Sequence, residues 1–201
     1  GTKFGKTESG AIWLTADKTS PYQFYQFWLN ATDKDAPKYI RTFTFIEKAT
    51  IEALELEHAE APHLRLLQKR LAAEITVMVH SQEALDSALR TTEILFNKKS
   101  TLEDLKQLSN QEIMDGFAGV PQAKISKSDI DAGLGIIDAL SAKSGFLSSN
   151  GEARRELKGN SISVNKTKVK EDYVITSTDL INDSVVILGK GKKNNYIIIV
   201  E

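Results

Sequence analysis

Residues 20–28 read Ser-Pro-Tyr-Gln-Phe-Tyr-Gln-Phe-Trp, a run that predicts the first turns of an α-helix. A serine that can cap, a proline at the first helical position and a glutamine three residues after the cap form a typical helix start. Phe24, Phe27 and Trp28 follow at intervals of three and four, so their rings share one stripe of the helix. Such rings could stack on nucleic-acid bases, but this spacing favours a buried stripe.

The helical pattern extends from this stretch to about residue 97. Four further segments carry apolar side chains at helical spacing, namely 35–45, 47–58, 62–80 and 81–95. We expect the inward-facing side chains to include Phe45 in the second helix, Leu56 in the third and Met78 in the fourth. Because no strand pattern interrupts these segments, residues 20–97 are predicted to form an all-α helical bundle.

The next stretch, residues 98–132, predicts less regular structure. Two short helical pieces, 102–108 and 111–117, are separated by loops. Ser109 and Glu112 have the spacing of a capping box at the start of the second piece. Glycine and proline then break the pattern. We therefore expect a partly ordered linker here.

From about residue 133 the pattern becomes mixed. A short helix around 136–140 and a second at 151–158, capped by Ser149, precede the strand-like runs. Strands are expected at 161–164, 185–188 and 196–200, with a basic, glycine-containing loop between the last two. Residues 133–201 are thus predicted to form a small α+β domain. The expected fold has two domains, an all-α helical bundle followed by an α+β domain.

Composition excludes several classes of protein. The 201 residues carry a net charge of −1 and no cysteine, so disulfides and thiolate metal sites are excluded. No apolar run approaches the ~20 residues of a membrane-spanning helix. The histidines His58, His63 and His80 lack the HExxH spacing, and we expect no metal site. Overall neutrality argues against affinity for nucleic acid along the whole chain.

Positive charge is nevertheless concentrated toward the carboxy terminus. Residues 1–150 carry 17 Lys and Arg against 20 Asp and Glu, whereas residues 151–201 carry nine against seven. The cations of the tail fall into three groups, which are Arg154, Arg155 and Lys158, then Lys166, Lys168 and Lys170, and finally Lys190, Lys192 and Lys193. RNA binding can use such a local patch.

The first seven residues contain a candidate phosphate-binding loop. Two lysines flank an aromatic residue and a glycine in the run Lys3-Phe4-Gly5-Lys6-Thr7, and a hydroxyl residue closes it. Glycine lets a ligand approach the backbone closely, and lysine supplies a mobile positive charge for phosphate oxygens. Taken alone, such a cluster is more often a solvated tail.

The residues that follow this loop make the run distinctive. Together with residues 7–14 (TESGAIWL) and 19–28 (TSPYQFYQFW), the loop closely resembles bacterial tyrosyl-tRNA synthetases, in which KFGKT or KFGKS is the form of the class I KMSKS loop. The resemblance implies a ligase that uses ATP with Mg²⁺ to join L-tyrosine to tRNA(Tyr) through tyrosyl-adenylate. It assigns ATP binding to Lys3, Phe4, Gly5, Lys6 and Thr7, with the two lysines contacting the phosphates.

The same resemblance implies that the chain is a carboxy-terminal piece of such an enzyme. A glycine-rich nucleotide fingerprint and the HIGH motif are absent from the 201 residues. Residues 1–19 would be a remnant of the catalytic domain, so the piece would bind tRNA, hold no catalytic residue of its own and not catalyse. We also expect a cytoplasmic location, no membrane partner, a parent that is homodimeric through the catalytic domain, and a monomeric piece.

The carboxy-terminal segment resembles the S-four RNA-binding domain, named after a ribosomal protein. The matching residues are Leu140, Gly145, Ser148 or Ser149, Ala153-Arg154, Leu157, Gly159 and Val164-Asn165. Lys166 stands where that family usually has glycine. The implied RNA-binding set is Ser149, Arg154, Arg155, Lys158, Asn165, Lys166 and Lys168. A competing interpretation is that Glu152 and Glu156 neutralise this helix locally.

The helical bundle is implied to contact the tRNA anticodon. Asp33 and Asp35 are our candidates for accepting hydrogen bonds from bases, although an acidic N-cap is an equally good interpretation of this pair. Two other functions remain open at this point. The chain could be a free-standing, ribosome-associated RNA-binding module of the S-four type, or a helical scaffold that binds protein.

Overall fold

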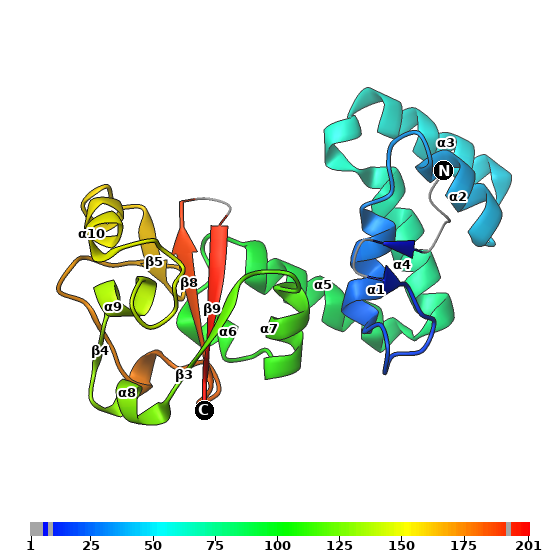
Figure 1. The fold of residues 1–201 in the computed structure, drawn as a ribbon. Coiled ribbons are helices and arrows are strands. Elements are labelled where there is room, and N and C mark those ends of the chain that lie inside the picture. Colours follow the sequence, from blue (N-terminus) through cyan, green and yellow to red (C-terminus); the bar gives the residue numbers. More distant parts are fainter. Residues whose placement is uncertain (1–5, 8–9, 192–193) are drawn as a thin grey trace. The chain divides into compact units, whose positions relative to one another are not determined.

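The computed structural model describes residues 6–7, 10–191 and 194–201 (Figure 1). The chain divides into two compact units, one that ends at Thr91 and one that runs from Thr92 to Glu201. The first unit is helical and the second combines helices with a small mixed sheet, which confirms the predicted fold class.

The first unit is built around four helices and the start of a fifth. In chain order its elements are β1 (Lys6–Thr7), β2 (Gly10–Ala11), α1 (Pro21–Leu29), α2 (Ala36–Phe43), α3 (Lys48–Glu60), η1 (Pro62–Leu64), α4 (Leu66–Val79) and most of α5 (Gln82–Phe96). Ser20 caps α1 by accepting a hydrogen bond from the Gln23 amide at 3.3 Å, as the sequence predicts. Phe24 on α1 and Leu67 and Leu71 on α4 are fully enclosed, so these two helices hold the core.

Some expectations for this unit are wrong in detail. The helix predicted to begin at 62 begins at Leu66, because η1 ends at Leu64 and the next residue, Arg65, has a left-handed backbone with φ of 54°. Phe45 is 92% exposed, since α2 ends two residues before it and the chain there is extended. Leu56 is 71% exposed, because Ile51 and His58 on another side of α3 face the core.

The second unit contains a five-stranded sheet with helices on both faces. After the end of α5, its first elements in chain order are α6 (Leu102–Leu105), α7 (Asn110–Gly116), β3 (Gln122–Ile125), α8 (Lys127–Asp131), β4 (Leu134–Gly135), α9 (Ile136–Leu140) and α10 (Asn150–Lys158). They are followed by β5 (Ile162–Val164), β6 (Thr167–Lys168), β7 (Val174–Ile175), η2 (Ser177–Asp179), β8 (Val185–Lys190) and β9 (Asn194–Val200). The strand order is β3-β9-β8-β5-β6, in which β3 runs parallel to β9 and the other pairs are antiparallel.

Alternating side chains of β8 separate the two layers of helices. Val186 and Leu188 belong to a core shared with α8, α9 and α10, whereas Val185 and Ile187 belong to a core shared with α6, α7 and the end of α5. Helices α9 and α10 accordingly lie on one side of the sheet, and α6 and α7 on the other (Figure 1). The predicted strands at 185–188 and 196–200 form the expected antiparallel hairpin.

Residues 98–132 contain α6, α7, β3 and α8. The predicted capping box is present at α7, where Ser109 and Glu112 bind each other's main-chain amides. Strand β3 pairs with β9 from Gln122 to Ile125, so this stretch contributes an edge strand to the sheet. The division into a loop at 1–19, a helical domain at 20–97, a linker at 98–132 and an α+β domain at 133–201 stays a prediction.

Candidate nucleic-acid interface

The amino-terminal motif lies largely outside the described residues. Lys3, Phe4 and Gly5 are among the residues that the structure does not describe. Lys6 and Thr7 form β1, whose backbone pairs with β2 through Lys6 with Ala11 and Thr7 with Gly10. The assignment of these five residues to ATP phosphates therefore stays a prediction.

Helix α10 presents a cationic surface in the second unit. Ser149 is its N-cap, and its hydroxyl accepts a hydrogen bond from the Glu152 amide at 3.2 Å. Its apolar side chains, Ala153 and Leu157, are buried against the sheet core. Because each residue advances the helix by about 100°, the exposed side chains of Arg154, Arg155 and Lys158 fall within an arc of about 100° on the other side. We call these three residues the α10 cationic face.

The two glutamates of α10 pair with a residue outside this face. Lys190 at the end of β8 forms ion pairs with Glu152 at 3.1 Å and with Glu156 at 3.2 Å. Glu152 also accepts hydrogen bonds from the Ser148 amide and hydroxyl, at 2.9 and 2.7 Å. These hydrogen bonds, led by the serine hydroxyl, lower the pKa of Glu152 to about 2, so it is ionised at neutral pH. Both carboxylates thus pair with a cation from the sheet, which argues against the competing interpretation of local neutralisation.

The members of the α10 cationic face differ in their partners. Arg154 pairs with Glu171 through Nε at 2.9 Å, and its side chain remains 52% exposed. Within the described part of the chain, no side chain pairs with Arg155 or Lys158, and both are exposed. Lys168 is exposed on β6 and donates to the Ser161 carbonyl at 2.8 Å. Of these four cations, Arg155 and Lys158 are therefore the most available to a ligand.

Two members of the predicted RNA-binding set have structural roles instead. Asn165 is 3% exposed, donates to the Asp179 carbonyl at 2.6 Å and accepts from the Ile187 amide at 2.9 Å. Its backbone is left-handed, with φ of 43°, which asparagine tolerates better than most residues. The Lys166 ammonium donates to the main-chain oxygens of Ile94 and Asn97 at the end of α5. We therefore leave Asn165 and Lys166 out of the interface.

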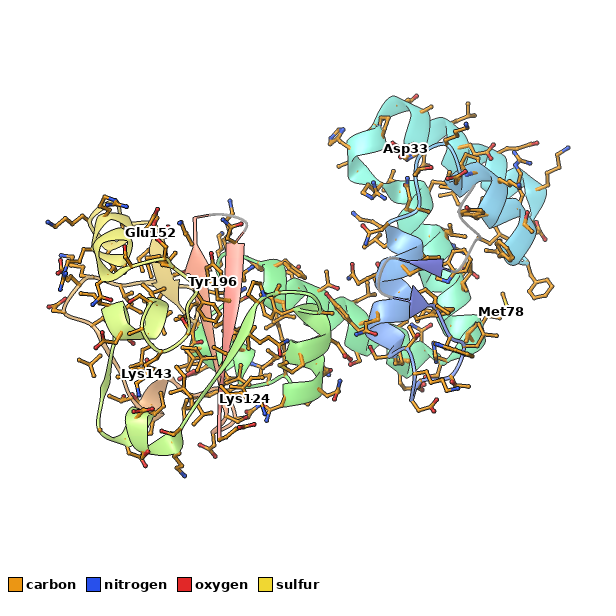
Figure 2. All side chains as sticks on the ribbon, in the orientation of Figure 1. Asp33, Met78, Lys124, Lys143, Glu152 and Tyr196 are labelled. Carbon is orange, nitrogen blue, oxygen red and sulfur yellow. The ribbon has the colours of Figure 1, made fainter. Side chains whose placement is uncertain are left out.

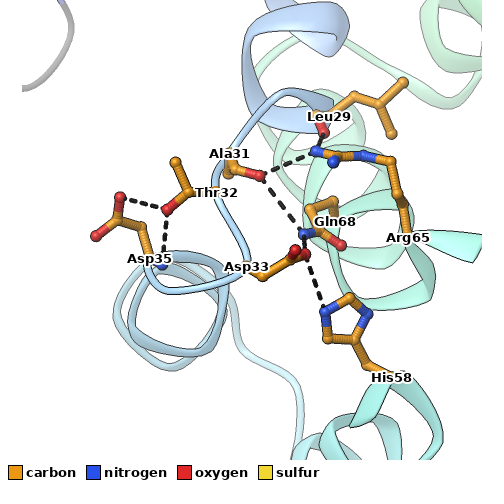
Figure 3. A network of polar contacts seen from close by, with 8 residues as sticks. All are labelled: Leu29, Ala31, Thr32, Asp33, Asp35, His58, Arg65 and Gln68. Carbon is orange, nitrogen blue, oxygen red and sulfur yellow. Dashed lines mark hydrogen bonds and ion pairs between the residues drawn. The ribbon is translucent and has the colours of Figure 1, made fainter. Parts of the chain in front are cut away.

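In the first unit, Asp33 lies at the centre of a polar network (Figure 3). Its Oδ1 atom accepts from Gln68 Nε2 at 2.6 Å and lies 3.1 Å from His58 Nε2. Neither of these contacts uses Oδ2, and the Asp33 side chain is 59% exposed. Gln68 is fully buried and His58 nearly so, so the network fixes one carboxylate oxygen and leaves the other toward solvent.

The chain on either side of Asp33 is held as well. Arg65 donates through Nη2 to the carbonyls of Leu29 at 2.7 Å and Ala31 at 2.9 Å. Asp35 occupies the N-cap position of α2 but makes no capping hydrogen bond, and its Oδ2 accepts from the Thr32 hydroxyl at 2.7 Å. Asp35 therefore stands at an N-cap position without making the hydrogen bond of a cap, and Asp33 is not an N-cap. Sequence reasoning missed Arg65, Gln68 and His58, because they lie 25–37 residues from the atoms they bind.

The first unit also contains an apolar pocket of about 340 Å³. Helices α1 and α4 line it together with Ile12, Leu14 and Phe43. Met78, labelled in Figure 2, lies at this pocket and is 48% exposed, where we expected an inward-facing side chain. Of the predicted stripe on α1, Phe24 and Trp28 are buried, and Phe27 lines the pocket beside them.

Two kinds of feature are absent from the described residues. Over residues 6–7, 10–191 and 194–201, no helix is both long and apolar enough to cross a membrane. The same residues contain no group of three His, Cys, Asp or Glu side chains placed to hold a metal ion.

Comparison with known proteins identifies the family. Residues 1–97 match the family model for class I tRNA synthetases (W and Y), and residues 112–199 match that of the tyrosine–tRNA ligase SYY-like C-terminal domain. The tyrosine–tRNA ligases of Flavobacterium johnsoniae and Flavobacterium psychrophilum are 58% and 56% identical over 98% of this chain.

The chain matches only part of these relatives, and its similarity to solved structures is weak. The chain spans about half the length of these relatives, 46% of each. A solved C-terminally truncated Aspergillus nidulans mitochondrial tyrosyl-tRNA synthetase is 31% identical over 43% of this chain and 25% of its own, with a TM-score of 0.41, too low to bear on the fold. The family models and the close relatives agree along nearly the whole sequence, and the chain belongs to the tyrosine–tRNA ligase family.

Proposed function

We propose that this chain binds tRNA(Tyr) and is the tRNA-binding part of a tyrosine–tRNA ligase. The observation that carries the proposal is the α10 cationic face, in which Arg155 and Lys158 are exposed and unpaired among the described residues while both glutamates of the helix bind Lys190. Exposed Arg and Lys side chains on one helix face suit the phosphates of a folded RNA.

The connection around Asp33 supplies a second contact of a different chemical kind. A carboxylate oxygen accepts hydrogen bonds from the exocyclic amines of bases. Lysine and arginine side chains are donors and cannot make this contact. Asp33 Oδ2 is held in one place because Oδ1 is fixed by Gln68 and His58. We propose that Asp33 contacts an anticodon base, and that Asp35 assists from the next position but one.

The family membership supports a proposal for the activity of the longer protein. We propose that it joins L-tyrosine to tRNA(Tyr) in the cytoplasm and uses ATP with Mg²⁺. Lys3 and Lys6, with Phe4, Gly5 and Thr7, would hold the ATP phosphates, a role that suits two ammonium groups beside a glycine. ATP supplies the phosphoanhydride that is cleaved to activate tyrosine. We keep the expectation that the longer protein is a homodimer and this chain a monomer.

Titration with tRNA(Tyr) at several salt concentrations tests the proposal. We compare the wild type with Arg155→Gln/Lys158→Gln and with the matched double variant Lys98→Gln/Lys106→Gln, which removes the same charge from exposed positions elsewhere in the second unit. Loss of two phosphate contacts should weaken binding about 10- to 100-fold and reduce the salt slope by about two. The control should change affinity by less than about three-fold. Equal losses in both double variants, or no binding by the wild type in dilute buffer, would contradict the proposal.

A further inference from the structure

Lys190 occupies a position between the sheet and the acidic side of α10. Its ammonium nitrogen lies 3.1 Å from a Glu152 oxygen and 3.2 Å from a Glu156 oxygen, and its side chain is only 23% exposed. The lysine comes from β8, whose partner strand β5 follows α10 directly in the chain. One cation of the sheet therefore binds both carboxylates of the helix.

The glutamates have an alternative partner on their own helix. Residues three apart on an α-helix are neighbours, and Glu152 and Arg155 have this spacing. A carboxylate that turned toward Arg155 would cancel one of the two unpaired cations of the α10 cationic face. It would also place negative charge beside the path of an approaching phosphate.

Two serines help to keep the glutamates turned away from that face. Glu152 is held by the Ser148 amide and hydroxyl, and Glu156 accepts from the Ser161 hydroxyl at 2.5 Å. These neutral contacts orient the carboxylates without balancing their charge. Among the described residues, Lys190 is the one cation that pairs with either glutamate. The balance of charge on α10 therefore depends on Lys190.

We propose that Lys190 is a positioning residue for RNA binding: it holds Glu152 and Glu156 on the sheet side of α10, so that Arg155 and Lys158 stay available to phosphate groups. The inference rests on the proposed function, because it concerns the same surface. It assigns Lys190 a role through the glutamates and no phosphate contact of its own.

The test uses the full 201-residue chain and four variants. Lys190→Gln should weaken tRNA(Tyr) binding about three- to ten-fold, and Lys106→Gln, which removes one exposed charge from the opposite face of the sheet, by less than about two-fold. Lys190→Gln/Glu152→Gln should return to within about two-fold of the wild type. Lys190→Gln/Glu103→Gln has the same net charge but neutralises a carboxylate on α6, and it should not recover.

The salt slope separates positioning from direct contact. If Lys190 touched a phosphate, Lys190→Gln would lower the slope by about one, and adding Glu152→Gln would not restore it. That result overturns the inference, as does equal recovery with Glu103→Gln or a Lys190→Gln loss no larger than that of Lys106→Gln. Melting curves recorded by circular dichroism show which variants are folded.

A second probe keeps the inference separate from the proposed function. The salt concentration at which each variant elutes from immobilised heparin reports the α10 cationic face without tRNA. If the wild type does not bind tRNA(Tyr), the proposed function fails. The salt concentrations at which the variants elute from heparin then decide the role of Lys190. We expect the wild type and Lys190→Gln/Glu152→Gln to elute at the same salt concentration. Lys190→Gln should elute at a lower one. Any other order overturns the inference.

Discussion

Lys166 Nζ lies 2.6 Å from the main-chain oxygen of Ile94, which ties the turn between β5 and β6 to the last turn of α5. The same nitrogen lies 2.7 Å from the Asn97 oxygen. Carbonyls at the end of a helix lack partners within the helix, and a cation there is favoured by the helix dipole. Lys166, the residue that departs from the S-four pattern, thus caps the carboxy-terminal end of α5.

Replacing this lysine should destabilise the second unit. Lys166→Met removes two hydrogen bonds from a charged donor, and we expect a loss of about 1–3 kcal/mol in the free energy of unfolding. Thermal melting by circular dichroism measures it. Lys168→Met, which loses a bond from an exposed ammonium to the Ser161 carbonyl, serves as control and should cost less than about 0.5 kcal/mol. Equal costs would contradict the capping role.

Asn165 should be more sensitive still. Asn165→Ala leaves the Ile187 amide and the Asp179 carbonyl without their hydrogen-bond partners in a buried site. It also places alanine in the left-handed region at φ of 43°, which asparagine tolerates better. We expect a loss of about 2–4 kcal/mol. Asn165→Gly keeps the backbone conformation but loses the same hydrogen bonds, so it should be less harmful than alanine. Urea unfolding of both variants decides between them.

Glu152 should make stability depend on pH in acid. Its pKa is lowered from 4.5 to about 2 by the Ser148 and Lys190 hydrogen bonds, so the folded state favours the ionised form. The resulting stabilisation is fully present above the unfolded pKa of 4.5 and is lost as the pH falls toward about 2. The melting temperatures of the wild type and Glu152→Gln should therefore converge over this range. A difference that stays constant with pH would show that the carboxylate charge does not matter.

Local sequence signals predicted the elements well. Caps such as Ser20, Ser109 and Ser149 were found because a cap and its amide lie three residues apart. The β8–β9 hairpin was found because alternating apolar residues flank a glycine-containing loop. Apolar spacing alone misplaced Leu56, since it does not show which side of α3 meets a neighbour, and Phe45, since it does not show where α2 ends.

The partners of polar side chains could not be predicted in the same way. Lys190 binds carboxylates 34 and 38 residues away, and Lys166 binds carbonyls 69 and 72 residues away. Which cations of a basic tail remain exposed and unpaired among the described residues depends on these distant pairings. The sequence identified the cationic helix, and the fold distinguished Arg155 and Lys158 from Asn165 and Lys166.

Arg65 allows the Asp33 connection to be tested separately from the α10 cationic face. Arg65→Met loses both bonds to the Leu29 and Ala31 carbonyls and keeps a β-carbon at φ of 54°. Arg65→Gly loses the same bonds but removes a left-handed strain of about 1 kcal/mol. We therefore expect the order of stability to be wild type, then glycine, then methionine, with methionine about 2–3 kcal/mol below the wild type.

Tryptophan fluorescence during urea unfolding measures this order, since Trp13 and Trp28, the two tryptophans of the chain, both lie in the first unit. The control is Arg70→Met, which breaks an exposed ion pair with Glu74 and should cost less than about 0.5 kcal/mol. If glycine proves worse than methionine, backbone strain at Arg65 is not significant and its guanidinium bonds alone determine the effect. If neither variant exceeds the control, Arg65 does not hold the connection, and the fixed position of Asp33 must come from Gln68 and His58.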